Sequence, residues 1–238
     1  MADRRTGLDL VEKVSGVART QEELDRFVHD VCAAAMNHFR GCVGVSIYLV
    51  LDGGLRAAGF ATRGASDETA YHDPDHSECL AIMRRPVTLA TVDRLRGSWP
   101  GFADFMDRQG FGSVLSVPLV VDHTVIGSMG LYSASPEDFD EVDVKIAGAA
   151  GQVCAGSVAA ALEIIGAREI AEQLETAMQS RATIEQAKGI LMAVRGVSED
   201  EAFEIIRKSS QDRNIKVRTL AEHIVSGAVD LSSRASRR

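Results

Sequence analysis

The chain contains no proline after Pro136, although the segment that follows is long enough for several helices. Proline inside a helix removes a hydrogen bond and clashes with the preceding turn, so its absence permits one helix to run past residue 175. Ser135 precedes Pro136 and acidic residues follow it, which is the usual composition of a helix start. We therefore predict one long helix that begins near Pro136.

Apolar residues recur along this predicted helix at alternating spacings of three and four residues, which is typical of a coiled coil. A seam of this kind pairs two helices along their length. We therefore expect a helical linker over residues 161–177 and a homodimer. The positions in the seam are Ile170, Leu174, Ala177, Arg181 and Ile184.

Turn and capping signals divide the rest of the chain into three helices. Gly196 ends the first of them, as a glycine just past a helix terminus. Ser198 with Glu201 forms a capping box that opens the second helix, and Thr219 with Glu222 repeats the pattern for the third. This order predicts a small bundle. The residues predicted to be buried in its last two helices are Ala202, Phe203, Ile206, Leu220, Ala221, Ile224 and Val225.

Cations recur every seven residues along the first of these helices. Arg181, Lys188 and Arg195 therefore share one face, with a drift of only ~20° per step. Residues 177–238 carry 11 Lys and Arg against 8 Asp and Glu, a charge of +3, whereas the rest of the chain carries −11. This asymmetry favours a localised contact with an anionic partner, although the stripe alone is more simply a solvated surface. The apolar seam beside the stripe comprises Ile184, Ala187, Leu191 and Val194.

The first part of the chain alternates between helical and strand periodicity. Helical spacing is found over residues 8–39, 74–84 and 98–109. Strands with period two are predicted at 44–50 and 55–62 around a turn at 52–54, at 87–89, and at 113–121 and 124–133 around Asp122-His123. Adjacent strands joined by short turns predict an α+β domain built on an antiparallel sheet.

Two of these strand pairs, VSIYLVLDGGLRAAGF and SVLSVPLVVDHTVIGSMGLYSASPEDFDEVD, resemble those of a GAF domain. The resemblance covers roughly residues 20–165 and implies a small-molecule sensor, which we place at 8–160. Its pocket would lie between the sheet and residues 74–109. The ligand is unknown. We expect no cofactor, because the cyclic-nucleotide motif of GAF domains and a cysteine context for bilin attachment are both missing. The candidates to line the pocket, for which core packing is the simpler explanation, are Trp99, Phe102 and Phe111.

Residues 178–228 closely resemble the ANTAR domain of transcription antitermination regulators. IEQAKGILM, a Gly-Val-Ser turn, EAFEIIRKSS and TLAEHIV occur in order at the family's separations. The resemblance implies binding to paired stem-loops in leader RNA, usually by a dimer, which prevents a terminator from forming. We place this RNA-binding domain at 178–230, followed by a basic tail at 231–238.

The resemblance also implies which residues contact RNA. The first helix contributes Arg181, Lys188 and Gly189, where the missing side chain either admits RNA or permits tight helix packing. Arg and Lys suit phosphate contact in hairpin loops. The second helix and the polar turn after it contribute Arg207, Asn214 and Lys216. Three further cations have weaker support as RNA contacts, namely Arg195, Arg213 and Arg218.

Two other functions stay open at this stage. A GAF-type thiol reductase would need cysteines that converge in the pocket, for which Cys42 and Cys79 are candidates, whereas Cys32 and Cys154 lie on predicted helices outside it. A sensor could also act through a protein partner without RNA. We expect a regulator rather than an enzyme.

Metal binding and membrane insertion are not expected. His72, His76 and Cys79 have suitable spacing for a metal site, but Pro74 interrupts the helix they would need and a fourth ligand is missing. The longest apolar run, residues 146–162, is shorter than the ~20 residues that span a bilayer. We therefore predict a cytoplasmic protein with no metal ion and no membrane contact.

Overall fold

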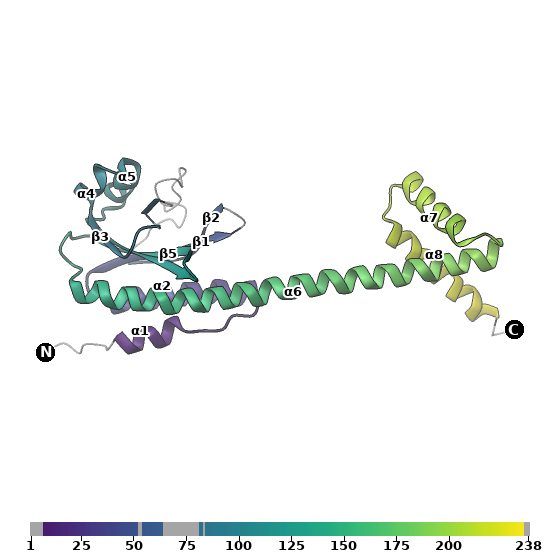
Figure 1. Cartoon of the computed structure of the whole chain (residues 1–238), viewed down its shortest axis with the longest axis horizontal. Coiled ribbons are helices and arrows are strands. Elements are labelled where there is room, and N and C mark those ends of the chain that lie inside the picture. The colour runs from purple at the N-terminus through teal and green to yellow at the C-terminus, as the bar shows by residue number, and fades with distance from the viewer. Residues whose placement is uncertain (1–6, 52–53, 64–80, 83, 236–238) are drawn as a thin grey trace. The chain divides into compact units, whose positions relative to one another are not determined.

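The computed structural model describes residues 7–51, 54–63, 81–82 and 84–235 (Figure 1). The chain divides into two compact units, Met1–Gly166 and Ala167–Arg238, each with its own hydrophobic core. The first unit is an α+β domain and the second is a bundle of helices, which confirms the predicted fold class. One helix, α6 (Glu141–Arg195), contributes residues to both units.

The first unit contains a five-stranded antiparallel sheet with the order β2-β1-β5-β4-β3. Both predicted hairpins form. Asp122 and His123 have φ angles of 46° and 64°, the left-handed values that a two-residue hairpin requires. The strands are β1 (Cys42–Leu51), β2 (Gly54–Thr62), β3 (Thr88–Thr91), β4 (Ser113–Val121) and β5 (Thr124–Ser133).

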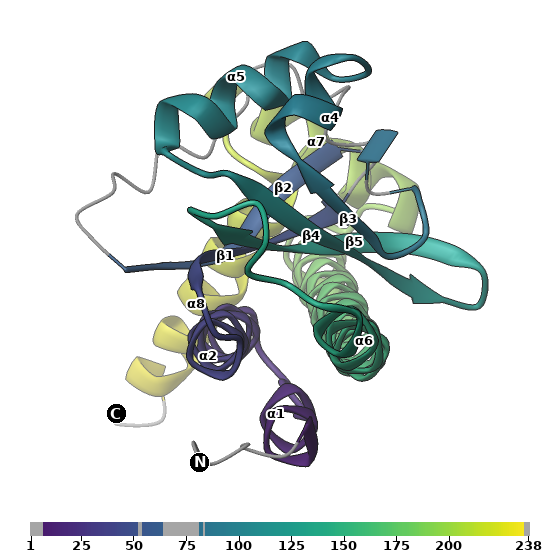
Figure 2. The ribbon, with the colours of Figure 1, turned by 90° about the vertical axis from the view of Figure 1, so that its left-hand side faces the viewer.

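Helices cover the two faces of this sheet differently (Figure 2). One face packs on α2 (Gln21–His38) and the first part of α6, with α1 (Gly7–Val14) beyond them. Gly151 allows α6 to lie close to β4, because a Cβ there would be 2.4 Å from Cγ1 of Val117. The opposite face lies under α4 (Val92–Arg96) and α5 (Pro100–Gln109).

Two predicted helices in this unit are wrong in extent, and a third differs by two residues at its start. The single helix expected at 8–39 is two helices, because Thr20 caps α2 by accepting the N–H of Glu23 at 3.2 Å. The long helix begins at Glu141 rather than near Pro136. Oδ1 of Asp140 accepts the N–H groups of Val142 and Asp143, so the cap lies five residues later than Ser135 predicts. The helix expected at 98–109 begins at Pro100, and the helix expected at 74–84 falls almost entirely outside the described residues.

The uninterrupted helix is confirmed, since α6 spans 55 residues. It is also long and apolar enough to cross a membrane, because one 18-residue window has a mean hydropathy of 1.4. A third of that window is buried inside the protein. Ala150, Cys154 and Val158 are fully buried against the sheet, so the core of the first unit accounts for part of this apolar character.

The second unit packs the end of α6 against α7 (Glu199–Arg213) and α8 (Val217–Ala235). Gly196 has a φ of 65° and ends α6, and the capping box of Ser198 and Glu201 forms as predicted. The predicted capping box at Thr219 is wrong, because α8 begins two residues earlier. The hydrophobic core of this unit is formed by Ala187, Ile206, Leu220 and Ala221.

Two predicted core residues of this unit are instead exposed. Phe203 is 40% exposed and Val194 is 77% exposed. The buried stripe of α7 follows Ala202, Ile206 and Ser210 at a spacing of four, and Phe203 lies one position off that stripe. The helical periodicity therefore predicts more buried apolar positions than a bundle of three short helices covers.

Candidate functional site

The cations between Arg181 and Arg218 divide into two groups. Three of them form ion pairs with nearby carboxylates. Nη2 of Arg207 lies 2.6 Å from Glu204, and Nε of Arg218 lies 2.8 Å from Glu222; the third is Lys188. Within the part of the chain that the structure describes, the cations without a hydrogen bond or ion pair are Arg181, Arg195, Lys208, Arg213 and Lys216.

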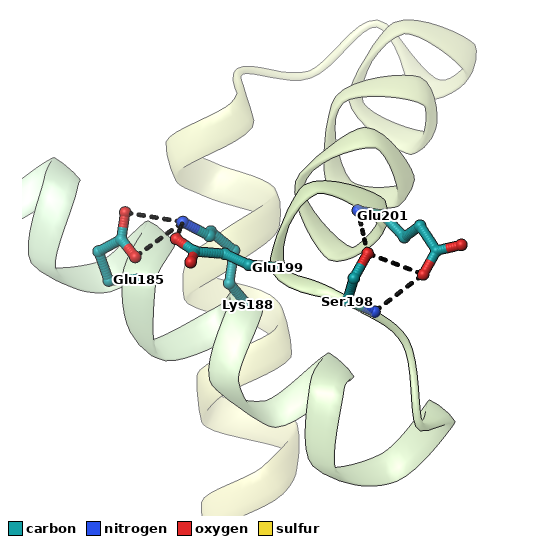
Figure 3. Close-up of polar contacts among 5 residues, drawn as sticks. All are labelled: Glu185, Lys188, Ser198, Glu199 and Glu201. Atoms are coloured by element: carbon teal, nitrogen blue, oxygen red, sulfur yellow. Dashed lines mark hydrogen bonds and ion pairs between the residues drawn. The ribbon is translucent and has the colours of Figure 1, made fainter.

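Lys188 lies at the centre of a charge cluster between α6 and α7 (Figure 3). Its Nζ donates to both oxygens of Glu185 at 3.0 and 2.8 Å, and to Oε1 of Glu199 at 2.5 Å. The Lys188 side chain is only 10% exposed, whereas the two carboxylates are more than half exposed. We call Glu185, Lys188 and Glu199 the Lys188 cluster.

Hydrogen bonds within the Lys188 cluster stabilise the charged forms of Lys188 and Glu199. Those to Glu185 and then Glu199 raise the pKa of Lys188, and the bond from Lys188 lowers the pKa of Glu199. A phosphate could reach Nζ of Lys188 only by displacing a carboxylate. Contact between Lys188 and RNA therefore stays a prediction, and it requires that a carboxylate first leave Nζ.

The start of α7 positions Glu199 for this cluster. Oγ of Ser198 accepts the N–H of Glu201 at 3.3 Å, and the Glu201 carboxylate accepts the N–H of Ser198 at 2.8 Å (Figure 3). The backbone N–H of Ser198 is the main cause of a lowered pKa at Glu201. The capping box thus fixes the first turn of α7, in which Glu199 reaches back to α6.

Gly189, Asn214 and Lys216 lie on the surface of the second unit. A Cβ at Gly189 would meet no atom within 4 Å, so packing inside this unit does not require a glycine there. Asn214 has a φ of 50° and ends α7, with its N–H bonded to Gln211 O. The left-handed backbone at this position explains why Asn214 is found there, without any contact to RNA. At Gly189, by contrast, the open surface allows close approach by a partner.

The unpaired Arg195 and Arg213 lie at the same groove of the second unit. This groove has a volume of about 250 Å³ and lies among α6, α7 and α8. Its lining also includes Ser209 and His223, which the sequence analysis did not single out. Ser209 precedes Arg213 by one helical turn, which is the signal that could have placed it on the same face. We call this the three-helix groove.

A second hollow lies in the first unit, between the sheet and α5, where the sequence predicts a pocket. The described residues enclose about 30 Å³, room for about one water molecule. Phe102 lines this cavity. Trp99 and Phe111 do not line it: Arg85 lies 4.7 Å over the Trp99 ring, and Phe111 stacks on Tyr132.

The sheet surface of this cavity is unusually polar for a buried face. Ser46 and Tyr132 share a hydrogen bond at 3.2 Å between their hydroxyl groups. Ser116 and Ser128 are each 6% exposed, and among the described residues their hydroxyls have no partner. Buried hydroxyls without partners are costly, so they favour a polar ligand or ordered water in the cavity.

The three described cysteines lie outside the cavity. Cys32, Cys42 and Cys154 belong to the core on the opposite face of the sheet. Burial raises the pKa of Cys42 to about 11 and that of Cys154 to about 12, and it raises the pKa of Cys32 still further. Protonated thiols are poor nucleophiles, so these three are unsuited to reductase chemistry. Cys79, the other candidate, lies outside the described residues.

The described residues contain no group of three or more side chains that could hold a metal ion. The spacing of His72, His76 and Cys79 falls on residues that the structure does not describe.

Two family models match the chain, a GAF domain over residues 21–159 and an ANTAR domain over residues 172–225. The GAF match spans more than half of the chain. The chain belongs to the GAF domain family. Its ANTAR domain follows the GAF domain, in the order that the sequence motifs predict. This combination is that of a regulator of the antitermination type. No curated protein matches the chain.

Solved structures share the GAF fold at low sequence identity. The GAF domain of cyanobacteriochrome TePixJ is 13% identical with a TM-score of 0.50, and the match covers 66% of this chain and 96% of that one. The chromophore-binding domain of bacteriophytochrome RpBphP3 from R. palustris is 10% identical with a TM-score of 0.50, over 67% of this chain and 62% of that one. At these identities the likeness shows the fold alone.

Proposed function

We propose that this GAF–ANTAR protein is a signal-responsive transcription antitermination regulator that binds stem-loops in leader RNA. The observation that carries the proposal is the ANTAR match over residues 172–225, most of a segment that folds as its own helical unit. The cations of this unit without carboxylate partners support contact with phosphates, because no internal ion pair must break first. Among the residues predicted from the family, Arg181 and Lys216 meet this requirement, and Gly189 adds an open surface on the same helix as Arg181.

We infer that the protein acts as a homodimer paired through α6. Ile170 and Leu174, two successive positions of the predicted coiled-coil seam, are each 60% exposed, and Met178, next to the seam position Ala177, is 74% exposed. Exposed apolar residues in such a row favour a second helix as their partner. A dimer would hold two ANTAR domains together, so that binding of one stem-loop raises the effective concentration of the other.

We also infer that the GAF domain controls RNA binding in response to a small polar ligand. The unpartnered hydroxyls of Ser116 and Ser128 support such a ligand, for which the cavity of about 30 Å³ would have to open, and α6 runs without interruption from this domain into the ANTAR domain. A ligand that binds one arrangement of the paired helices more tightly would shift the population toward it. In this role the protein is a cytoplasmic regulator and not an enzyme.

The test is binding of the full-length protein to an RNA with two tandem stem-loops, compared between wild type and Arg181→Ala. Arg26→Ala is the matched control, because Arg26 is an exposed helical arginine of the first unit. We expect wild type and control to bind alike, and Arg181→Ala to bind several-fold more weakly with intact circular dichroism. A wild-type protein that binds neither this RNA nor single stem-loops would contradict the proposal.

A further inference from the structure

We propose that the three-helix groove receives an unpaired nucleobase of the bound RNA, while Arg195 and Arg213 hold the adjoining phosphates. This inference rests on the proposed function and assigns a site to it. The groove lies wholly within the second unit and is lined from α6, α7 and α8. Its volume of about 250 Å³ is below the ~300–1,000 Å³ of pockets for drug-sized ligands and suits one flat ring system.

The floor of the groove is aliphatic. Leu191, Ile206 and Leu220 come from three different helices, and Ile206 and Leu220 are buried in the core of the unit. Ile205 and Ile224, both half-buried, extend the apolar lining toward solvent. The bundle therefore leaves an apolar hollow that its own side chains do not fill, and a base removed from water would cover it.

The rim of the groove is cationic. Arg195 ends α6 and Arg213 ends α7, so the two guanidinium groups come from different helices. Neither has a carboxylate partner among the described residues, in contrast to Arg207 and Arg218. A guanidinium group can bind phosphate through two hydrogen bonds and can also stack on the plane of a base. The rim is thus suited to both parts of a nucleotide.

Two smaller polar residues complete the lining. Ser209 and His223 offer a hydroxyl and an imidazole, each able to donate or accept a hydrogen bond at a base edge. Among the residues that the structure describes, no acidic side chain lines the groove. This charge distribution favours an anionic occupant over an apolar peptide segment or a second copy of the same cationic surface.

The groove also determines the kind of RNA that fits. Bases within a duplex are stacked and paired, whereas loop bases can turn out and insert into a protein. The ANTAR domain has no Phe, Tyr or Trp other than Phe203, which does not line the groove. Aliphatic side chains and arginine planes would therefore replace the aromatic stacking used by other single-strand readers.

The test fills the groove without changing its charge. Ser209→Leu in the full-length protein is compared with Ser226→Leu, an exposed serine of α8 that lies outside the groove. Each variant is measured against the tandem stem-loop RNA and against RNAs with one abasic site at each loop position in turn. We expect Ser209→Leu to lose about tenfold in affinity, the effect of one base contact, and Ser226→Leu to bind as wild type does.

The abasic RNAs locate the inserted base. At one loop position, removal of the base should weaken wild type about tenfold and leave Ser209→Leu unaffected, because the same contact is already lost. Should Ser209→Leu disturb folding by circular dichroism, Arg195→Ala and Arg213→Ala take its place, since both side chains are exposed. Each should bind intact RNA more weakly.

Three results would overturn the inference. In the first, wild type binds RNA and Ser209→Leu, Arg195→Ala and Arg213→Ala bind it equally well, so the proposed function stands and the groove has no part in it. In the second, Ser209→Leu changes the oligomeric state in solution and not the affinity for RNA, which assigns the groove to a second copy. In the third, wild type binds no RNA, which removes the proposed function as well.

Discussion

The Lys188 cluster and the three-helix groove lie on the same small bundle, yet they leave their cations in opposite states. In the cluster, Nζ of Lys188 has two carboxylate partners and is almost fully covered. At the groove, Arg195 and Arg213 are exposed, with no partner among the described residues. A positive charge that is already paired stabilises the fold, whereas an unpaired one beside an apolar hollow is available to a ligand. Sequence spacing places Lys188 and Arg195 on one stripe, so spacing does not separate these two uses.

The largest expected effect comes from the core that supports both regions. Ile206 is fully buried and also forms part of the floor of the groove. Ile206→Ala should lower the free energy of unfolding of the second unit by about 2–5 kcal/mol, a large loss for a core this small. Thermal denaturation followed by circular dichroism checks this. A loss below about 1 kcal/mol would mean that the groove collapses to fill the gap.

A smaller effect is expected in the Lys188 cluster, and it should depend on pH. Since the pKa of Glu199 is lowered in the folded protein, its ion pair stabilises the fold above the ordinary pKa near 4.5 and this stabilisation is lost as the pH falls through the folded value. Glu199→Gln should therefore lower the melting temperature at pH 7 by on the order of a few degrees.

The difference between wild type and Glu199→Gln should shrink as the pH falls below the ordinary pKa of Glu199. Asp200→Asn is the control, because Asp200 occupies the same turn of α7 with no ion pair among the described residues. An equal pH dependence in both variants would show that the helix terminus, and not Lys188, is the source of the effect. The same outcome would leave Lys188 available to RNA and so weaken the contrast with the groove.

At Gly189, stability and binding should change in opposite directions. Because a Cβ there meets nothing within 4 Å, Gly189→Ala should stabilise the second unit by up to about 1 kcal/mol through helix propensity. If RNA approaches the backbone at this position, the same change should weaken RNA binding several-fold. Ala193→Gly, on an exposed position of the same helix, should destabilise the unit and leave RNA binding unchanged. Chemical denaturation and RNA titration measure the two effects separately.

Much of the fold follows from local signals in the sequence. The two hairpins, the uninterrupted α6 and the capping box at Ser198 depend on turn residues and on the absence of proline. Helix starts are predicted less well. Ser135 and Thr219 are residue types that often cap helices, but in the structure neighbouring residues occupy the first positions of the two helices. Asp140 caps α6 instead, and α8 starts at Val217.

The candidate site is predicted less completely than the fold, because it depends on which carboxylate each cation meets. Glu199 is eleven residues from Lys188 and follows a turn, so helical spacing does not reveal their ion pair. The convergence of Arg195 with Arg213 depends in the same way on the packing of separate helices. Helical spacing does bring Arg207 close to Glu204, three residues earlier on α7, and that pair could have been predicted.

The most direct test of the account is the salt dependence of RNA binding in two double variants of the full-length protein. Arg195→Ala with Arg213→Ala removes the unpaired arginines of the groove, and Arg207→Ala with Arg218→Ala removes the same number of paired ones. The slope of log affinity against log salt concentration should fall by about 1 for each lost phosphate contact, thus by about 2 in the first variant and little in the second. Equal slopes in the two variants, or a slope reduced only in the second, would contradict the claim that RNA is bound by the unpaired cations of the ANTAR domain.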